Sequence, residues 1–104
     1  MTTSRIQLAN YSELPEKIGQ VFKIGEEEIA VFRLSNGEVR AVENRSPHPK
    51  GGTLVDGLVS GEYIFCPVYD WKISLMDGNV QAPDEGQVKV YPIEVSENKV
   101  YINM

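Results

Sequence analysis

The sequence has only one cysteine, Cys66, and one histidine, His48, in 104 residues. A single cysteine excludes a disulfide within the chain and fits a reducing compartment. It also leaves few side chains for soft metals, because thiolate and imidazole are the usual ligands of such ions. Any site for a soft metal in this chain therefore depends on one residue of each type.

Basic residues are also scarce, since 10 Lys and Arg stand against 15 Asp and Glu and give a net charge of −5. Nucleic acid is disfavoured as a partner, because neutralising phosphates requires clustered Lys and Arg. No apolar run approaches the roughly 18–20 residues of a membrane span. Residues 1–6 lack the basic start and apolar core of a signal peptide. We therefore expect no membrane partner and a cytoplasmic location.

Short segments rich in β-branched and aromatic residues recur between turn residues, most clearly at 20–24, 27–34 and 39–43. About eight such strands are expected, with one short helical turn over residues 11–17. The spacing predicts a single all-β domain over residues 1–104, built as a sandwich or partly open barrel of small antiparallel sheets. The turn signals recur evenly, so no linker or domain boundary is expected.

Three local signals refine this prediction. Ser12 is the candidate N-cap of the helical turn, because its hydroxyl can accept a backbone N–H. Asn36-Gly37 predicts a tight hairpin turn with positive φ at both residues. Pro92 cannot donate to a ladder and therefore indicates a sheet edge or a bulge.

Two turn-rich loops carry the residues of greatest chemical interest. The first, residues 44–54, contains His48 and a Gly-Gly pair, and the second, residues 65–71, reads Phe-Cys-Pro-Val-Tyr-Asp-Trp. Short strands are predicted around both loops. We therefore expect the two loops at the tips of β-hairpins on neighbouring strands.

This pair of loops resembles the Rieske family, and the resemblance extends over most of the chain. It implies a Rieske-like fold in which two Cys and two His hold a [2Fe–2S] cluster, with Cys-x-His in the first loop and Cys-x-x-His in the second. The four corresponding positions here are Ser46, His48, Cys66 and Tyr69. Serine and tyrosine oxygens are poor substitutes for thiolate and imidazole at such irons. We expect no metal site, no other cofactor and no catalytic residue in this chain.

A Rieske-like chain of this size with an incomplete ligand set is similar to the small subunit of assimilatory NAD(P)H-dependent nitrite reductase. The match rests on Val-Glu-Asn-Arg at residues 42–45 and on the run Cys-Pro-x-x-Asp-Trp-Lys-Ile-Ser-Leu at 66–75. It implies a large-subunit partner that holds FAD, a [4Fe–4S] cluster and sirohaem and reduces nitrite to ammonium in nitrate assimilation. The chain itself would be a non-catalytic subunit of that oxidoreductase.

The candidate docking residues lie in the two loops. They are His48, Pro49, Lys50, Tyr69 and Asp70. Two alternative functions stay open. One is a Rieske-type [2Fe–2S] electron-transfer ferredoxin whose cluster is completed by unusual ligands or shared between chains, and the other is a stand-alone β-domain that binds another partner or a small molecule.

Structural roles are the simpler interpretation of several of these side chains. A lone histidine in a loop is more often exposed or hydrogen-bonded than a ligand, which applies to His48. Cys66 is expected to be a small buried apolar residue, and Trp71 to belong to the core. Tyr69 is expected either to fill space that a cluster would otherwise take or to contact a partner.

Overall fold

The computed structural model describes residues 5–49, 51–67 and 70–103. These residues form three antiparallel sheets and one short helical turn. The elements are β1 (Arg5–Asn10), η1 (Tyr11–Glu13), β2 (Gln20–Ile24), β3 (Glu27–Arg33), β4 (Val39–Glu43), β5 (Leu58–Ser60), β6 (Tyr63–Phe65), β7 (Lys72–Ser74), β8 (Val90–Tyr91), β9 (Ile93–Ser96) and β10 (Lys99–Asn103). The predicted all-β fold with a single helical turn is confirmed. Within these residues no helix has the length and hydropathy of a membrane span.

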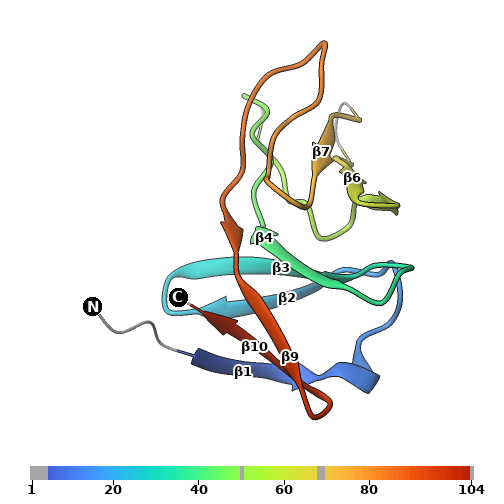
Figure 1. The fold of residues 1–104 in the computed structure, drawn as a ribbon. Helices are drawn as coiled ribbons and strands as arrows, with labels where there is room; N and C mark the ends of the chain where they lie inside the picture. The colour runs from blue at the N-terminus through green and yellow to red at the C-terminus, as the bar shows by residue number, and fades with distance from the viewer. Residues whose placement is uncertain (1–4, 50, 68–69, 104) are drawn as a thin grey trace.

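The three sheets form layers, which Figure 1 shows from the side. The terminal sheet has the strand order β1-β10-β9, the central sheet β2-β3-β4-β8 and the loop sheet β5-β6-β7. The central sheet lies between the other two and supplies residues to two cores. A sheet that is covered on both faces requires strands that are apolar at consecutive positions, rather than alternating.

Strand β3 meets this requirement, since its residues 29–32 are all buried. Ile29 and Val31 face the terminal sheet, and Ala30 and Phe32 face the loop sheet. The core on the terminal side consists of Leu14, Ile29, Val31, Val39, Ala41, Tyr91, Val100 and Ile102. The core on the loop side consists of Ala30, Phe32, Leu34, Val42, Leu54, Val59, Ile64, Cys66, Ile73, Leu75, Val80 and Val88.

The helical turn η1 is shorter than predicted, and Ser12 is not its N-cap. Asn10 occupies the N-cap position without a side-chain hydrogen bond to the turn. Ser12 lies inside the turn, where its N–H donates to Oδ1 of Asn98 at 2.9 Å and its hydroxyl accepts from Nδ2 of the same residue at 3.1 Å. The polar groups of Ser12 are therefore paired with Asn98, which is 86 residues away in the sequence, and not with the backbone of the helical turn.

The connection between β3 and β4 is longer than the predicted two-residue turn. The N–H of Leu34 donates to the carbonyl of Glu38 at 2.8 Å, and the N–H of Gly37 donates to the carbonyl of Leu34 at 3.0 Å. Only Gly37 has a positive φ, of 91°, so the expectation for Asn36 is wrong. The tight turn with positive φ at both residues lies instead at Glu97–Asn98, between β9 and β10.

Pro92 lies where the chain passes from the central sheet to the terminal sheet. It follows β8 and precedes β9, and both strands are at the edges of their sheets. The predicted edge position is therefore confirmed. Because proline has no N–H to donate, this junction lacks one donor that a continuing ladder would need.

The pH dependence of stability tests whether the side chain of Tyr91, at the end of β8, is buried in the core. Its hydroxyl donates to Oε1 of Glu27 at 2.9 Å, and burial, followed by that hydrogen bond and the negative charges of Glu27 and Glu43, raises the pKa of Tyr91 to about 12. The unfolded tyrosine ionises near 10. Stability from the neutral hydroxyl is therefore fully present below pH 10 and is lost as the pH rises towards 12.

We expect wild-type protein to lose about 2–3 kcal/mol more unfolding free energy than Tyr91→Phe across this alkaline interval, since a tenfold change in ionisation constant corresponds to about 1.4 kcal/mol. Urea unfolding of both proteins below pH 10 and at about pH 12 measures the difference. Equal losses in the two proteins would show that Tyr91 does not keep its proton in the folded state.

Candidate functional site

The two loops identified in the sequence lie at the same end of the molecule, beside the loop sheet (Figure 1). The second loop connects β6 to β7 and is the tip of a hairpin, as predicted. The first loop leaves β4 in the central sheet and enters β5 in the loop sheet. The prediction of a hairpin tip is wrong for this first loop, which is a crossover between layers.

Asn44 closes the first loop at its base. This residue is buried, and its Oδ1 accepts the backbone N–H groups of Leu54 and Val55, each at 2.9 Å. Its Nδ2 donates to Oε1 of Glu28 on β3 at 3.3 Å. One side chain thus joins the beginning and the end of the loop and fastens both to the central sheet.

Inside this base the backbone of the first loop turns back on itself. The N–H of Ser46 donates to the carbonyl of Gly52 at 2.9 Å, and the N–H of Gly51 donates to the carbonyl of His48 at 2.8 Å. Gly51 and Gly52 have φ values of 76° and 108°, in the region that favours glycine. The Gly-Gly pair is therefore needed for the turn itself.

Direct side-chain contacts join the two loops. The thiol of Cys66 donates to Oγ of Ser46 at 3.1 Å, and both residues are buried. The rings of His48 and Trp71 meet edge to face, with centroids 4.8 Å apart and planes at 66°. Such aromatic pairs stabilise by about 0.5–1.5 kcal/mol beyond their buried area. The buried role expected of Cys66 is confirmed, whereas Trp71 is half-buried and packs against the edge of the loop-side core.

The donor set of these loops does not fit a Rieske-type iron–sulfur cluster. Such a cluster requires two thiolates and two imidazoles, and the whole sequence contains one of each. Ser46 and Cys66 occupy the two positions that would bind one iron, and here they are hydrogen-bonded to one another. Within residues 5–49, 51–67 and 70–103, no three His, Cys, Asp or Glu side chains gather as metal ligands.

The candidate docking residues divide between described and undescribed positions. Pro49 and Asp70 are exposed, and His48 is half-buried against Trp71. Lys50 and Tyr69 lie outside the described residues. Among the described candidate docking residues, Asp70 therefore supplies one exposed carboxylate, next to the His48–Trp71 ring pair.

Sequence reasoning missed Asn44 as the residue that closes the first loop. Its position immediately after a strand was the available signal, because asparagine at such a boundary often hydrogen-bonds nearby backbone. It also missed the contribution of the segment around Gly86 to the site. A Cβ built at Gly86 would lie 3.3 Å from Cβ of Pro47, so the two backbones lie close together. The proline-containing connection before β8 therefore packs against the first loop.

Solved structures share this fold over almost the whole chain. A Mycobacterium tuberculosis protein assigned as the small subunit of an NADH-dependent nitrite reductase has a TM-score of 0.89 at 23% identity, covering 100% of this chain and 97% of that one. A Sphingomonas yanoikuyae B1 ferredoxin has a TM-score of 0.81 at 22% identity, covering 97% and 99%. At these identities the likeness shows the fold, and it confirms the predicted Rieske-like architecture.

Sequence comparison gives a curated relative and a family. The NAD(P)H nitrite reductase large subunit of Klebsiella oxytoca is 29% identical over 99 residues, which cover 91% of this chain. The chain spans about a tenth of the length of that relative, since the match covers 10% of it. The family described as the Rieske-like [2Fe–2S] domain matches residues 5–103.

Proposed function

The chain belongs to the Rieske-like [2Fe–2S] domain family, and we propose that within this family it is the small subunit of an assimilatory NAD(P)H-dependent nitrite reductase. In this role it is a non-catalytic chain that docks on a large subunit through the two loops. The large subunit would hold FAD, a [4Fe–4S] cluster and sirohaem and reduce nitrite to ammonium in the cytoplasm. This chain would carry no cofactor of its own.

The observation that carries the proposal is the alignment of nearly the whole chain with a segment of a nitrite reductase large subunit. In that relative the matching segment and the remainder of the large subunit belong to one polypeptide, which supports association of the corresponding parts here. The loop geometry supports a docking role in addition. Hydrogen bonding and aromatic contact hold the loops in a fixed arrangement, and a preorganised surface loses less entropy when it binds.

Asp70 is the described residue best suited to test docking by the second loop. It is exposed, and its φ of 51° lies in the left-handed region that asparagine also tolerates. Asp70→Asn therefore removes the charge without straining the backbone. We expect the variant to bind the purified large subunit about threefold to tenfold more weakly, as measured by isothermal titration calorimetry, because a charge at the edge of an interface contributes modestly.

Glu62→Gln is the matched control, because Glu62 is an exposed acid in the turn between β5 and β6, at the other end of β6 from the second loop. It should bind as tightly as wild type. Equal affinities for wild type, Asp70→Asn and Glu62→Gln would contradict docking through Asp70. The same titration applies to Lys50→Glu and Tyr69→Ala, for which we also expect weaker binding.

A Rieske-type ferredoxin is the second candidate, favoured by the fold shared with the Sphingomonas ferredoxin. It would require a cluster completed by ligands other than the usual four. Iron and acid-labile sulfide analysis of the purified chain separates the two functions. Stoichiometric iron and sulfide with visible absorbance would support the carrier, and a colourless iron-free chain would support the accessory subunit.

A further inference from the structure

Strand β9 is one edge of the terminal sheet and pairs on one side only, with β10. The N–H of Asn103 donates to the carbonyl of Pro92 at 3.0 Å, which makes these two residues a hydrogen-bonded pair. Hydrogen-bonded and non-bonded pairs alternate along antiparallel strands. Glu94 therefore bonds to β10, whereas the N–H and C=O groups of Ile93 and Val95 point to the open side of the sheet.

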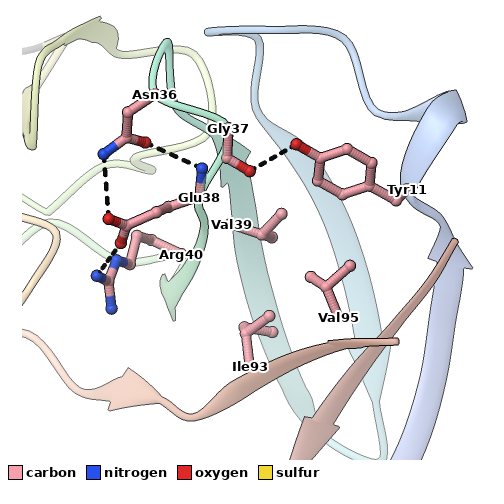
Figure 2. Close-up of a pocket in the computed structure, with 8 residues that line it drawn as sticks. All are labelled: Tyr11, Asn36, Gly37, Glu38, Val39, Arg40, Ile93 and Val95. Carbon is pink, nitrogen blue, oxygen red and sulfur yellow. Dashed lines mark hydrogen bonds and ion pairs between the residues drawn. The ribbon is translucent and has the colours of Figure 1, made fainter. Parts of the chain in front are cut away.

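A groove of about 530 Å³ lies where the side chains of β9 face the central sheet. Figure 2 shows Ile93 and Val95 pointing towards Val39 on β4, with Tyr11 closing the far side. Val95 remains 45% exposed although it lies on the core-facing side of β9. The groove thus continues the terminal-side core to the surface, with apolar side chains that nothing in residues 5–49, 51–67 and 70–103 covers completely.

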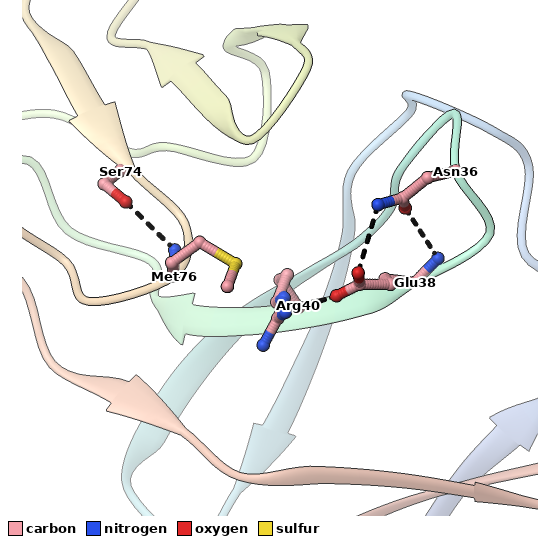
Figure 3. A network of polar contacts seen from close by, with 5 residues as sticks. All are labelled: Asn36, Glu38, Arg40, Ser74 and Met76. Carbon is pink, nitrogen blue, oxygen red and sulfur yellow. Dashed lines mark hydrogen bonds and ion pairs between the residues drawn. The ribbon is translucent and has the colours of Figure 1, made fainter.

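The rim of the groove is polar and held in place by a short network. Oε2 of Glu38 accepts from Arg40, and Oε1 accepts from Nδ2 of Asn36 at 3.1 Å (Figure 3). Beyond Arg40 a second hollow of about 290 Å³ extends towards Met76, which is 44% exposed. Apolar surface inside a polar rim is the usual anatomy of a protein interface.

We propose that the open edge of β9 and this groove bind an extended segment of the large subunit, which adds a fourth strand to the terminal sheet. Backbone groups of Ile93 and Val95 would supply the hydrogen bonds, and alternate side chains of the added strand would enter the groove. The side chain opposite Glu94 would lie on the outer face and be basic. This inference rests on the proposed function, and it adds a docking surface remote from the two loops, at the other end of the molecule (Figure 1).

Charge argues for a different chain rather than a second copy of this one. Two β9 edges that pair antiparallel form the most hydrogen bonds when Ile93 of each faces Val95 of the other. That register places Glu94 directly opposite Glu94, and like charges at opposed positions destabilise a sheet. Arg5 on β1 lies 3.6 Å from the Glu94 carboxylate and offsets this repulsion only in part, because both side chains are exposed. Each copy also has a net charge of −5. A strand with a basic residue at the central position has neither disadvantage.

Amide hydrogen exchange tests the proposal residue by residue. The chain is exchanged alone and in complex with purified large subunit, then released and read by NMR. The amides of Ile93 and Val95 should exchange rapidly in the free chain and about tenfold or more slowly in the complex. Those of Glu94 and Ser96 are bonded to β10 in both states and act as internal controls.

The exchange results distinguish docking on β9 from the proposed small-subunit function. A complex in which the amides of Ile93 and Val95 exchange as fast as in the free chain would overturn docking on β9 and leave the small-subunit role standing. If no complex forms, both proposals fail. Protection of these amides at high concentration without the large subunit would assign the edge to a second copy and overturn the proposed occupant.

Variants give an independent readout. Val95→Pro removes an N–H on the open side without removing a bond to β10, and edge strands tolerate proline at such positions. We expect it to weaken binding to the large subunit about tenfold or more, and Val95→Thr, which keeps the N–H and the branched shape, to bind as wild type. Glu94→Lys also removes the 3.6 Å ion pair of Glu94 with Arg5, so Arg5→Gln, which removes that pair and keeps Glu94, is its control. Glu94→Lys should weaken binding, whereas Arg5→Gln should bind as wild type. If neither Val95→Pro nor Glu94→Lys weakens binding, the proposal is overturned.

Discussion

Phe32→Ala is expected to lower the free energy of unfolding by about 3–5 kcal/mol, because truncating a buried phenylalanine removes apolar burial and leaves a cavity. Phe32 is fully buried on the face of β3 that packs against the loop sheet. Its surroundings are tight: a Cβ at Gly19 would lie only 2.7 Å from its ring. Urea unfolding monitored by circular dichroism measures the change.

Phe22→Ala is the matched control, since it deletes the same atoms from a half-buried phenylalanine on β2 that packs against the terminal-side core. It should cost clearly less than Phe32→Ala. Equal losses in the two variants would contradict the description of β3 as a strand buried on both faces. Neither phenylalanine lies in the two loops proposed for docking, so large-subunit binding below the unfolding transition should be retained.

Asn44→Ala should lower the free energy of unfolding by about 2–4 kcal/mol, because each buried group left without its hydrogen bond costs about 1–3 kcal/mol. The variant leaves the N–H groups of Leu54 and Val55 without their common acceptor. The first loop then loses the bond between its two ends. We therefore expect binding to the large subunit to weaken together with stability, as measured by titration of the folded variant.

Glu28→Ala separates the closure of the loop from the side-chain bond to β3. It removes only the acceptor of the 3.3 Å contact from Nδ2 of Asn44. Glu28 is exposed, so the loss should stay below about 1 kcal/mol. If Glu28→Ala destabilised the chain as much as Asn44→Ala, closure of the loop by Oδ1 would not be the reason for the effect.

The strands were predictable where apolar runs are long and both ends have turn residues. Residues 20–24 and 39–43 form β2 and β4 with the predicted bounds, and β3 ends one residue before the prediction. The sequence does not say which of two sheets each face of β3 contacts. An apolar run buried on both faces has no polar side to distinguish them, so the three-layer arrangement came only from the structure.

The candidate site was predictable in its residues and not in its contacts. His48 and Cys66 stood out as the only residues of their types. The hydrogen bond from Cys66 to Ser46 joins positions 20 residues apart in the chain. The ring contact of His48 with Trp71 likewise joins the first loop to the second. Such pairings depend on how the loop sheet packs on the central sheet, and no local propensity encodes that packing.

Native mass spectrometry of the chain mixed with purified large subunit tests whether a Rieske-like chain without a full ligand set acts as an accessory subunit. For an accessory subunit we expect a complex whose mass equals the cofactor-loaded large subunit plus this polypeptide alone. A chain that stays free of the large subunit, or that carries the added mass of an iron–sulfur cluster, would contradict the account.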